Sequence, residues 1–320
     1  MHIRILTAAD VRAAISMTEA IDAVARAYSQ LSAGKATMPL RSRFHTEKGV
    51  TLLMPAHLHE SGDFAVKIVS VYADNPKLGL PTVAATVLAL DPQTGMPLAL
   101  MEGDSLTALR TGAAGGVAAR YLARADAGTV ALFGAGVQAR SQLRAVMAVR
   151  NIERVWIVDP FASAAQRLAD DIAGWPDAPA VTLADLPQTA VAQADIVLAA
   201  TTATTPLFDG NDLKPGTHVT GVGSFTPQMQ EIDAATIRRA RVVVDQRDAA
   251  MAEAGDIIIG KAVIDAEIGE IINGDKPGRQ SDEEITFFKS VGLAVQDAVT
   301  AAAVLKAAEK KGLGTVIDMS

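Results

Sequence analysis

The stretch formed by residues 128–159 constrains the fold more than any other part of this sequence. An apolar run at 130–133 ends in a turn with G-x-G-x-x-A spacing, made by Gly134, Gly136 and Ala139. A helical pattern follows, and a second apolar run at 155–158 closes on Asp159, 23 residues after Gly136. This order of strand, glycine turn, helix, strand and terminal acid is typical of a dinucleotide-binding unit.

Each part of this pattern has a physical role. Gly134 permits the tight turn, and Gly136 lets the backbone approach a pyrophosphate with no Cβ in the way. Ala139 allows close packing of the helix on the strand, and the first N–H groups of the helix face the phosphates. Asp159 is placed to accept hydrogen bonds from an adenosine ribose. The turn therefore predicts a bound nicotinamide dinucleotide.

The residue at the end of the second strand also bears on which dinucleotide binds. The Asp159 carboxylate repels a 2′-phosphate, and Pro160 and Phe161 follow it where an arginine would favour NADP(H). We expect NAD(H) to be preferred, with NADP(H) still open.

Composition and charge exclude several classes of protein. The 320 residues carry a net charge of −7, which argues against a nucleic-acid partner because phosphate binding needs a basic face. There is no cysteine, so disulfides and thiol catalysis are excluded, and we expect no metal site. The first residues lack a signal pattern, and no apolar run approaches the ~18 residues of a membrane span. We expect a cytoplasmic protein with no membrane or nucleic-acid partner.

The first third of the chain reads as helices followed by an antiparallel sheet. Thr7 with Asp10, and then Thr18, resemble caps of two helices, the second of which runs to about Ser32. The period then changes to two, and strands are expected at 41–45, 50–54, 64–72 and 82–90. The turn at 91–95 joins the last of these to a strand at 97–101 in a hairpin.

Alternating strands and helices begin at Gly128 and predict a doubly wound parallel sheet. The strands are expected near 130–133, 155–158, 180–183, 196–200, 218–222 and 241–245. Before them, a helix at 106–122 is rich in small residues, which permits close approach of another backbone or of the cofactor. After them, 255–280 reads as short helices and irregular structure, and 286–309 as one long helix.

Three cations of the first third are candidates for binding an anion. Lys67 lies in a strand on an apolar face, where it is either an edge lysine that reaches water or a functional group. Arg110 sits among small residues of its helix, and Arg41 alternates with Arg43 on a strand. Arginine binds carboxylates through paired hydrogen bonds, so these residues suggest a carboxylate-bearing substrate. For His45 and His57, structural or surface roles are favoured over acid–base roles.

These motifs together identify the chain as a member of the ornithine cyclodeaminase/mu-crystallin family. The resemblance covers nearly the whole chain. Its motifs are Met54-Pro55, Lys67 in AVKIVS, LTALRTGAA at 106–114, GAGVQA at 134–139, VGSFTP at 222–227 and FFKSVGLAVQD at 287–297.

The resemblance implies a homodimer in which each subunit has two domains. Residues 1–112 with about 291–320 form a mixed α/β domain for substrate binding and dimerisation, and 113–290 form a Rossmann domain that binds NAD(P). The resemblance places the substrate carboxylate on Arg41, Lys67 and Arg110. The expected cofactor-binding residues are Thr82, Arg110, Thr111, Gly134, Gly136, Val137, Gln138, Asp159, Thr201, Val222, Gly223, Ser224, Ser290 and Val291.

One departure from the deaminating members points to the reaction. Where those members have an aspartate that acts on the substrate amine, this chain has Phe225, and their following lysine falls on Met229. Phenylalanine cannot accept a proton, so Phe225 is expected to line the substrate ring instead.

With Phe225 in this place, the VGSFTP stretch resembles that of the branch of the family that reduces ketimines. We therefore expect NAD(P)H-dependent reduction of a small cyclic imino acid, 1-pyrroline-2-carboxylate to L-proline or 1-piperideine-2-carboxylate to pipecolate, with Lys67 as the catalytic residue. Three alternatives remain open at this point: ornithine cyclodeaminase, alanine dehydrogenase, and a non-enzymatic ligand-binding protein similar to mu-crystallin.

Overall fold

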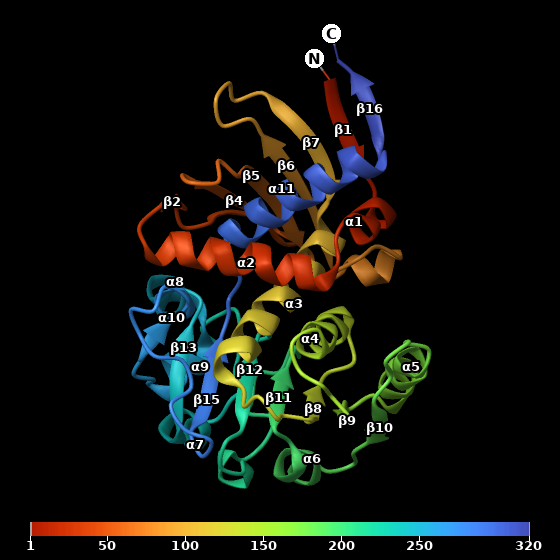
Figure 1. Cartoon of the computed structure of the whole chain (residues 1–320). Helices are drawn as coiled ribbons and strands as arrows, with labels where there is room; N and C mark the ends of the chain where they lie inside the picture. The colour runs from red at the N-terminus through yellow and green to blue at the C-terminus, as the bar shows by residue number, and fades with distance from the viewer. Residues whose placement is uncertain (1, 320) are drawn as a thin grey trace. The chain divides into compact units, whose positions relative to one another are not determined.

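The computed structural model describes residues 2–319, which divide into two compact units (Figure 1). Among the described residues, unit 1 comprises 2–110 and 293–319, and unit 2 comprises Thr111–Gly292. Each unit has its own eight-stranded sheet. None of the helices in residues 2–319 combines the length and the apolar character that a membrane crossing requires.

The sheet of unit 1 has the strand order β16-β1-β7-β6-β5-β4-β2, with β3 also paired to β4. All its recorded pairs are antiparallel except β1 with β7. Its strands are β1 (His2–Leu6), β2 (Ala36–Thr37), β3 (Ser42–His45), β4 (Val50–Leu58), β5 (Phe64–Val71), β6 (Val83–Leu90), β7 (Pro97–Glu102) and β16 (Thr315–Asp318). The helices are α1 (Ala8–Ala14), α2 (Met17–Ser32) and α11 (Ala294–Lys311), with a 3₁₀ turn, η1, at Asn75–Leu78.

Helix α11 lies along β4, β5 and β6, and α2 packs against α11 (Figure 1). On β5 the side chains alternate, so that Ala65 and Lys67 are buried while Ile68 is 45% exposed. The expected antiparallel strands and the hairpin at 91–95 are confirmed, although β4 extends to Leu58 and Arg41 lies just before β3.

The caps of the first helices were predicted with one error. Thr7 and Asp10 form the expected capping box of α1. The second helix begins two residues earlier than expected, because Ser16 caps it through a box with Glu19, and Thr18 lies inside the helix.

The sheet of unit 2 is parallel throughout its recorded pairs and has the order β10-β9-β8-β11-β12-β15-β13-β14. Its strands are β8 (Thr129–Phe133), β9 (Arg154–Val158), β10 (Ala180–Leu183), β11 (Ile196–Ala199), β12 (His218–Gly221), β13 (Ala240–Val244), β14 (Ala266–Glu267) and β15 (Ile285–Lys289). Its helices are α4 (Val137–Met147), α5 (Ala162–Ala173), α6 (Pro187–Gln193), α7 (Ala234–Arg239), α8 (Arg247–Glu253), α9 (Gly255–Gly260) and α10 (Ile268–Ile272), with a 3₁₀ turn, η2, at Gly210–Asp212.

The order in which the chain adds strands to this sheet reverses after β10, so that β8 and β11 are neighbours. The chain runs outward from β8 through β9 to β10 and then returns to β11 on the other side of β8. Because such crossovers are right-handed, the helices of the two halves cover opposite faces, and a crevice opens where the carboxyl ends of β8 and β11 diverge. The predicted doubly wound fold is confirmed, and the glycine turn follows β8 at this switch point.

One long element was assigned wrongly. Residues 285–289 form strand β15 between β12 and β13, and the last helix starts only at Ala294. All five residues of β15 are buried, and periodicity cannot distinguish such a strand from a buried helix. Gly292, with φ of +80°, separates the strand from α11. The short strands β1, β2, β14 and β16 were also not predicted.

The small residues of α3 (Gly103–Leu122) allow close packing within unit 2, as expected. A Cβ on Gly112 would lie 2.3 Å from Ser141 Oγ, and one on Gly115 would lie 1.8 Å from Gln142 Oε1. Gln142 also donates to the carbonyl of Thr111 at 2.6 Å. The glycines therefore bring the second half of α3 against α4.

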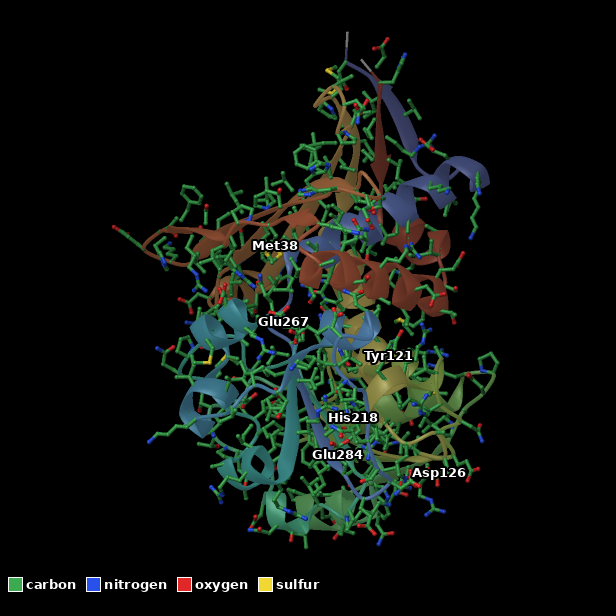
Figure 2. All side chains as sticks on the ribbon, turned by 60° about the vertical axis from the view of Figure 1, so that its left-hand side comes forward. Met38, Tyr121, Asp126, His218, Glu267 and Glu284 are labelled. Carbon is green, nitrogen blue, oxygen red and sulfur yellow. The ribbon has the colours of Figure 1, made fainter. Side chains whose placement is uncertain are left out.

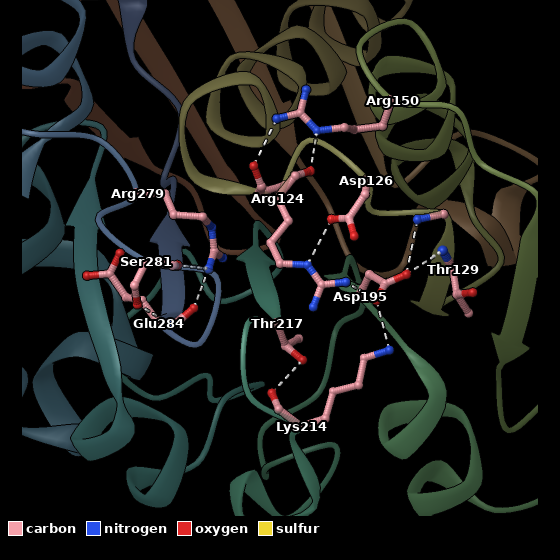
Figure 3. Close-up of polar contacts among 12 residues, drawn as sticks. Arg124, Asp126, Thr129, Arg150, Asp195, Lys214, Thr217, Arg279, Ser281 and Glu284 are labelled. Atoms are coloured by element: carbon pink, nitrogen blue, oxygen red, sulfur yellow. Dashed lines mark hydrogen bonds and ion pairs between the residues drawn. The ribbon is translucent and has the colours of Figure 1, made fainter.

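Polar contacts close the amino ends of the unit 2 strands (Figure 3). Asp195 accepts hydrogen bonds from the backbone N–H groups of Gly128 and Thr129, both at 3.0 Å, and forms ion pairs with Arg124 and Lys214. Arg150 donates to four carbonyls at the carboxyl end of α3, including that of Ala119.

The buried histidine of this sheet has a structural role. His218, on β12, lies among the strands of unit 2 (Figure 2) and hydrogen bonds with Thr286 and Thr220. Burial lowers the pKa of His218 to about 3, so it is neutral at physiological pH.

Candidate functional site

A buried cluster of charged side chains lies in unit 1, under the middle of the sheet. Lys67 projects from β5, Arg110 from α3 and Asp297 from α11, and they are 2%, 6% and 1% exposed. The possibility that Lys67 is an edge lysine reaching water is excluded, because β5 lies between β4 and β6.

Asp297 connects the two cations. Its Oδ2 lies 2.8 Å from Lys67 Nζ, and its Oδ1 accepts from Lys67 Nζ and from Arg110 Nε, both at 3.0 Å. The carboxylate therefore fixes the position of both head groups through direct contacts, as buried ions require.

A second contact orients the guanidinium of Arg110. Its Nη1 donates to Gln296 Oε1 at 3.2 Å, and Gln296 Nε2 donates to the hydroxyl of Tyr28 at 2.9 Å. Gln296 and Tyr28 are themselves buried, so the plane of the guanidinium is held from two directions.

The charge balance of the cluster favours an anion. Two cations face the single carboxylate of Asp297, and Arg41 adds a third positive charge near Lys67. Burial, Arg110 and Arg41 lower the pKa of Lys67, Asp297 raises it, and the result is a pKa of about 8. A ligand carboxylate would relieve the repulsion between the cations and stabilise the charged form of Lys67.

Two other expected residues of unit 1 lie outside the cluster. Arg41 is half-buried in the segment before β3, and its charge is close enough to affect the pKa of Lys67. Thr82 is half-buried just before β6, and its carbonyl accepts a hydrogen bond from the Tyr72 backbone.

The glycine turn of unit 2 has the geometry that a dinucleotide requires. Gly134 has φ of +96°, and a Cβ there would lie 2.6 Å from the Ala200 carbonyl oxygen. Gly136 is exposed and precedes α4 with no side-chain cap, and a Cβ there would meet no atom within 4 Å. The space in front of Gly136 and the uncapped helix start fit a pyrophosphate.

Asp159 lies beside this turn. Its Oδ2 accepts from the Ala135 N–H and its Oδ1 from the Phe161 N–H, both at 2.8 Å. The carboxylate is half-buried, and each oxygen has capacity for another donor, as a ribose hydroxyl would provide. Val137 is 67% exposed at the start of α4, and Gln138 is half-buried.

The loops after β11 and β12 are joined by a residue that sequence reasoning missed. Thr201 donates to Glu231 Oε1 through its backbone and its hydroxyl, at 2.6 and 2.8 Å. Gly223 and Ser224 donate to Glu231 Oε2 through their backbone N–H groups. Val222, directly after β12, is half-buried, while Phe225 is 43% exposed.

A second buried carboxylate holds the segment after β15. Asp245 Oδ2 accepts from the Ser290 hydroxyl and from the N–H groups of Val291 and Gly292, at 2.9 to 3.1 Å. Burial raises the pKa of Asp245, while these donors oppose the rise. The two expected residues Ser290 and Val291 are thus held at the end of a parallel strand.

The remaining candidates of the sequence have ordinary surroundings. His45 is exposed on β3, and His57 packs its ring near His59 and Phe64. Asp297, Glu231 and Asp245 carry charge in buried apolar segments, which is the feature that drew attention to Lys67 and that could have identified them.

Comparison with known proteins gives the same family along the whole chain. The family model described as "Ornithine cyclodeaminase/mu-crystallin family" matches residues 1–312. Delta(1)-pyrroline-2-carboxylate reductase of Bacillus cereus is 40% identical over 98% of this chain and 99% of its own length. Alanine dehydrogenase of Archaeoglobus fulgidus is 37% identical over 99% of this chain and 98% of its own.

A solved structure agrees with these relatives. The Delta(1)-pyrroline-2-carboxylate reductase of Thermococcus litoralis, solved in complex with NADH and L-proline, superposes with a TM-score of 0.93. It is 42% identical and covers 98% of this chain and 99% of its own. The chain therefore belongs to the ornithine cyclodeaminase/mu-crystallin family.

Proposed function

We propose that this protein is an NAD(H)-dependent reductase of small cyclic imino acids, with 1-pyrroline-2-carboxylate, reduced to L-proline, as its first candidate substrate. The observation that carries the proposal is the buried cluster of Lys67, Arg110 and Asp297, in which two cations face one carboxylate. The proposal is supported by the similarity to the reductases of Bacillus cereus and Thermococcus litoralis, which are 40% and 42% identical to this chain.

In this proposal the substrate carboxylate binds to the cations of unit 1. Arg110, held by Asp297 and Gln296, offers the rest of its guanidinium to one carboxylate, and Lys67 offers a single charge. Arg41 is the third cation that we propose for binding the substrate carboxylate. Fixing the carboxylate also fixes the adjacent C=N carbon, so that positioning is the main contribution of these residues to the rate.

NADH, when bound, supplies the hydride that adds to the imine carbon. The imine nitrogen must carry a proton to become the amine of the product, and a protonated C=N bond is the better electrophile. Lys67 is the chain's candidate for keeping that proton, since its pKa of about 8 allows it to donate near neutral pH.

The loop after β12 supports reduction over deamination. Phe225 stands where deaminating relatives have an aspartate, and a phenyl ring cannot take a proton from an amine. In this proposal Phe225, which is 43% exposed, lines the ring of the substrate.

We assign the preference for NADH to Asp159. Its carboxylate accepts from Ala135 and Phe161 and would repel a 2′-phosphate, with no arginine following it. An NADH-dependent reaction of this kind suits the cytoplasm, which is the location we expect.

The open face of the unit 1 sheet supports a homodimer. Because Lys67 points toward α11, its neighbours on β5 point to the opposite face, where Val66 and Ile68 lie beside Leu53 and Leu88 of the adjacent strands. Ile68 is 45% exposed, and a half-exposed apolar face of this kind is typical of a subunit interface.

A single set of assays tests the proposed reaction. NADH oxidation is followed with 1-pyrroline-2-carboxylate, with 1-piperideine-2-carboxylate, and with pyruvate plus ammonia, and ammonia release is measured with ornithine. We expect kcat/KM to be highest with a cyclic imine. The 37% identity to alanine dehydrogenase makes pyruvate plus ammonia the second candidate pair, which also forms a C=N bond beside a carboxylate. Ammonia release from ornithine without NADH oxidation would refute both.

A further inference from the structure

Three buried ionic side chains lie in unit 2 and have no role in the chemistry described so far. Glu231, Asp256 and Lys289 are all 0% exposed. Burying ions costs several kcal/mol each unless they are paired and hydrogen-bonded. The groups that these ions pair with therefore indicate what the ions hold in place.

Glu231 connects the carboxyl ends of two neighbouring strands. Oε1 accepts from Thr201, two residues after β11, through the backbone N–H at 2.6 Å and the hydroxyl at 2.8 Å. Oε2 accepts from Gly223 at 2.7 Å and Ser224 at 3.2 Å, just after β12. A carboxylate has about four acceptor positions, and here four donors use them.

The fit around Glu231 is tight. A Cβ on Gly223 would lie 2.1 Å from the Thr201 carbonyl oxygen and 2.5 Å from Glu231 Oε1. The loops after β11 and β12 are therefore in close contact at Gly223, and Glu231 fixes the distance between them.

Asp256 and Lys289 extend this connection to a third strand. Asp256 Oδ1 accepts from the N–H groups of Glu231 and Ile232, at 2.7 and 3.0 Å. Its Oδ2 lies 3.0 Å from Nζ of Lys289, the last residue of β15. The Asp256 N–H also donates to Ser224 Oγ at 3.2 Å. The ends of β11, β12 and β15 thus share one buried ionic network.

We propose that Glu231 is a positioning residue for the nicotinamide half of the cofactor. In parallel α/β sheets, ligands bind outside the carboxyl ends of the strands near the switch point. The glycine turn after β8 suits the pyrophosphate, which leaves the adjacent ends of β11 and β12 for the nicotinamide. Glu231 holds both of those ends while lying fully buried behind them. This inference rests on the proposed use of NAD(H), and it assigns Glu231 no contact with the substrate.

The test substitutes Glu231→Gln and compares two ligands by calorimetry, NADH and ADP-ribose. ADP-ribose has the adenosine and the pyrophosphate but no nicotinamide. The Gln amide would place an NH₂ group against N–H donors, so one loop loses its acceptor. We expect the Kd for NADH to rise about tenfold, equivalent to ~1.4 kcal/mol, and the Kd for ADP-ribose to stay within about twofold.

Asp195→Asn is the matched control. Asp195 is a part-buried carboxylate that accepts from two backbone N–H groups in the same sheet, but at the amino ends of β8 and β11. Its substitution should lower the melting temperature without changing the ratio of the two Kd values.

Equal weakening of NADH and ADP-ribose by Glu231→Gln would reduce Glu231 to a structural residue, and unchanged binding of both would also overturn the proposal. If Glu231→Gln does not fold, Glu231→Asp, whose carboxylate is withdrawn by one methylene, is measured in the same way with the same criteria. No imine is needed for this test. A wild-type protein that binds NADH but reduces no imine would refute the proposed reaction and leave the role of Glu231 standing.

Discussion

Lys67 Nζ lies 2.8 Å from Asp297 Oδ2, although 230 residues of sequence separate the two side chains. The pair joins β5 to α11 inside unit 1 and places a cation beside Arg110, which shares the same carboxylate. In an isolated buried ion pair, the two charges would neutralise each other. With a second cation present, the cluster has an excess of positive charge that an anionic substrate can balance.

Lys67→Met tests the role of this excess charge. The substitution removes the ammonium and retains the length of the side chain, so kcat/KM for the imino acid should fall roughly thirtyfold or more, since a buried charge-assisted contact accounts for ~2–5 kcal/mol. The Kd for NADH should stay within about twofold, because the glycine turn and Asp159, which we expect to hold most of the dinucleotide, lie in unit 2. Steady-state kinetics and calorimetry measure the two quantities.

Lys77→Met is the control for Lys67→Met. Lys77 also pairs with an aspartate, Asp74, but its side chain is 77% exposed. Its loss should leave both quantities unchanged. Full activity in Lys67→Met would remove this lysine from the substrate site.

The pH dependence of kcat/KM should follow the protonation of Lys67. Burial and Arg110 lower its pKa to about 8, so the ammonium is present below that pH and is lost as the pH rises through it. Groups that face it are Asp297, Arg110, Arg41 and, more distantly, Asp104. We therefore expect kcat/KM for the imino acid, which reports the free enzyme, to fall above about pH 8.

Asp297→Asn tests whether Lys67 is the group responsible for this pH dependence. The aspartate raises the pKa of Lys67, opposing burial, so its removal should shift the fall in kcat/KM to lower pH. A shift to higher pH, or a wild-type profile that stays flat well above pH 8, would contradict this assignment.

The dinucleotide half of the molecule was predictable because its signals are local. Gly134, Gly136 and Asp159 lie within one strand–helix–strand unit, and the structure gives each the conformation or contact that the pattern requires. The partner of Lys67 was not predictable in this way, since Asp297 meets it only through the packing of α11 on β5. Residues 286–289 lie in the fully buried strand β15, but a helix was predicted there because a continuous apolar run has no distinguishing period.

Glu231 illustrates the same limit. It follows the loop whose sequence indicated the type of reaction, yet its partner Thr201 comes from a different strand. Only the parallel pairing of β11 with β12 brings the two loop ends together.

Gly134 and Gly136 should respond differently to alanine. Gly134→Ala places a Cβ at φ of +96° and 2.6 Å from the Ala200 carbonyl, so unfolding should become easier by roughly 1–3 kcal/mol. Gly136 has φ of −86°, and its Cβ would meet no protein atom. Gly136→Ala should therefore keep the wild-type melting temperature of the ligand-free protein and still raise the Kd for NADH. Equal melting temperatures for the two variants would contradict this account of the turn.

Asp159→Asn should change the choice of cofactor. The substitution keeps the shape of the side chain and one acceptor oxygen for the contacts with Ala135 or Phe161, but it removes the charge that repels a 2′-phosphate. We expect the ratio of kcat/KM for NADPH to that for NADH to rise about tenfold, which corresponds to ~1.4 kcal/mol. An unchanged ratio would mean that Asp159 stabilises the glycine turn but does not discriminate between NADH and NADPH.

Ile68→Glu tests the open face of unit 1 as the dimer interface. Ile68 is 45% exposed on β5 and pairs across the strands with Leu53 and Thr86. A carboxylate on that face would be buried without a partner in a dimer but solvated in a monomer, so the equilibrium should shift toward monomer. Sedimentation of wild type and variant measures the shift. The exposed Val263, in unit 2, provides the control, because Val263→Glu adds the same charge at a side chain that is 82% exposed and should leave the assembly unchanged. A dimer that survives Ile68→Glu but dissociates with Val263→Glu would place the interface on unit 2 instead.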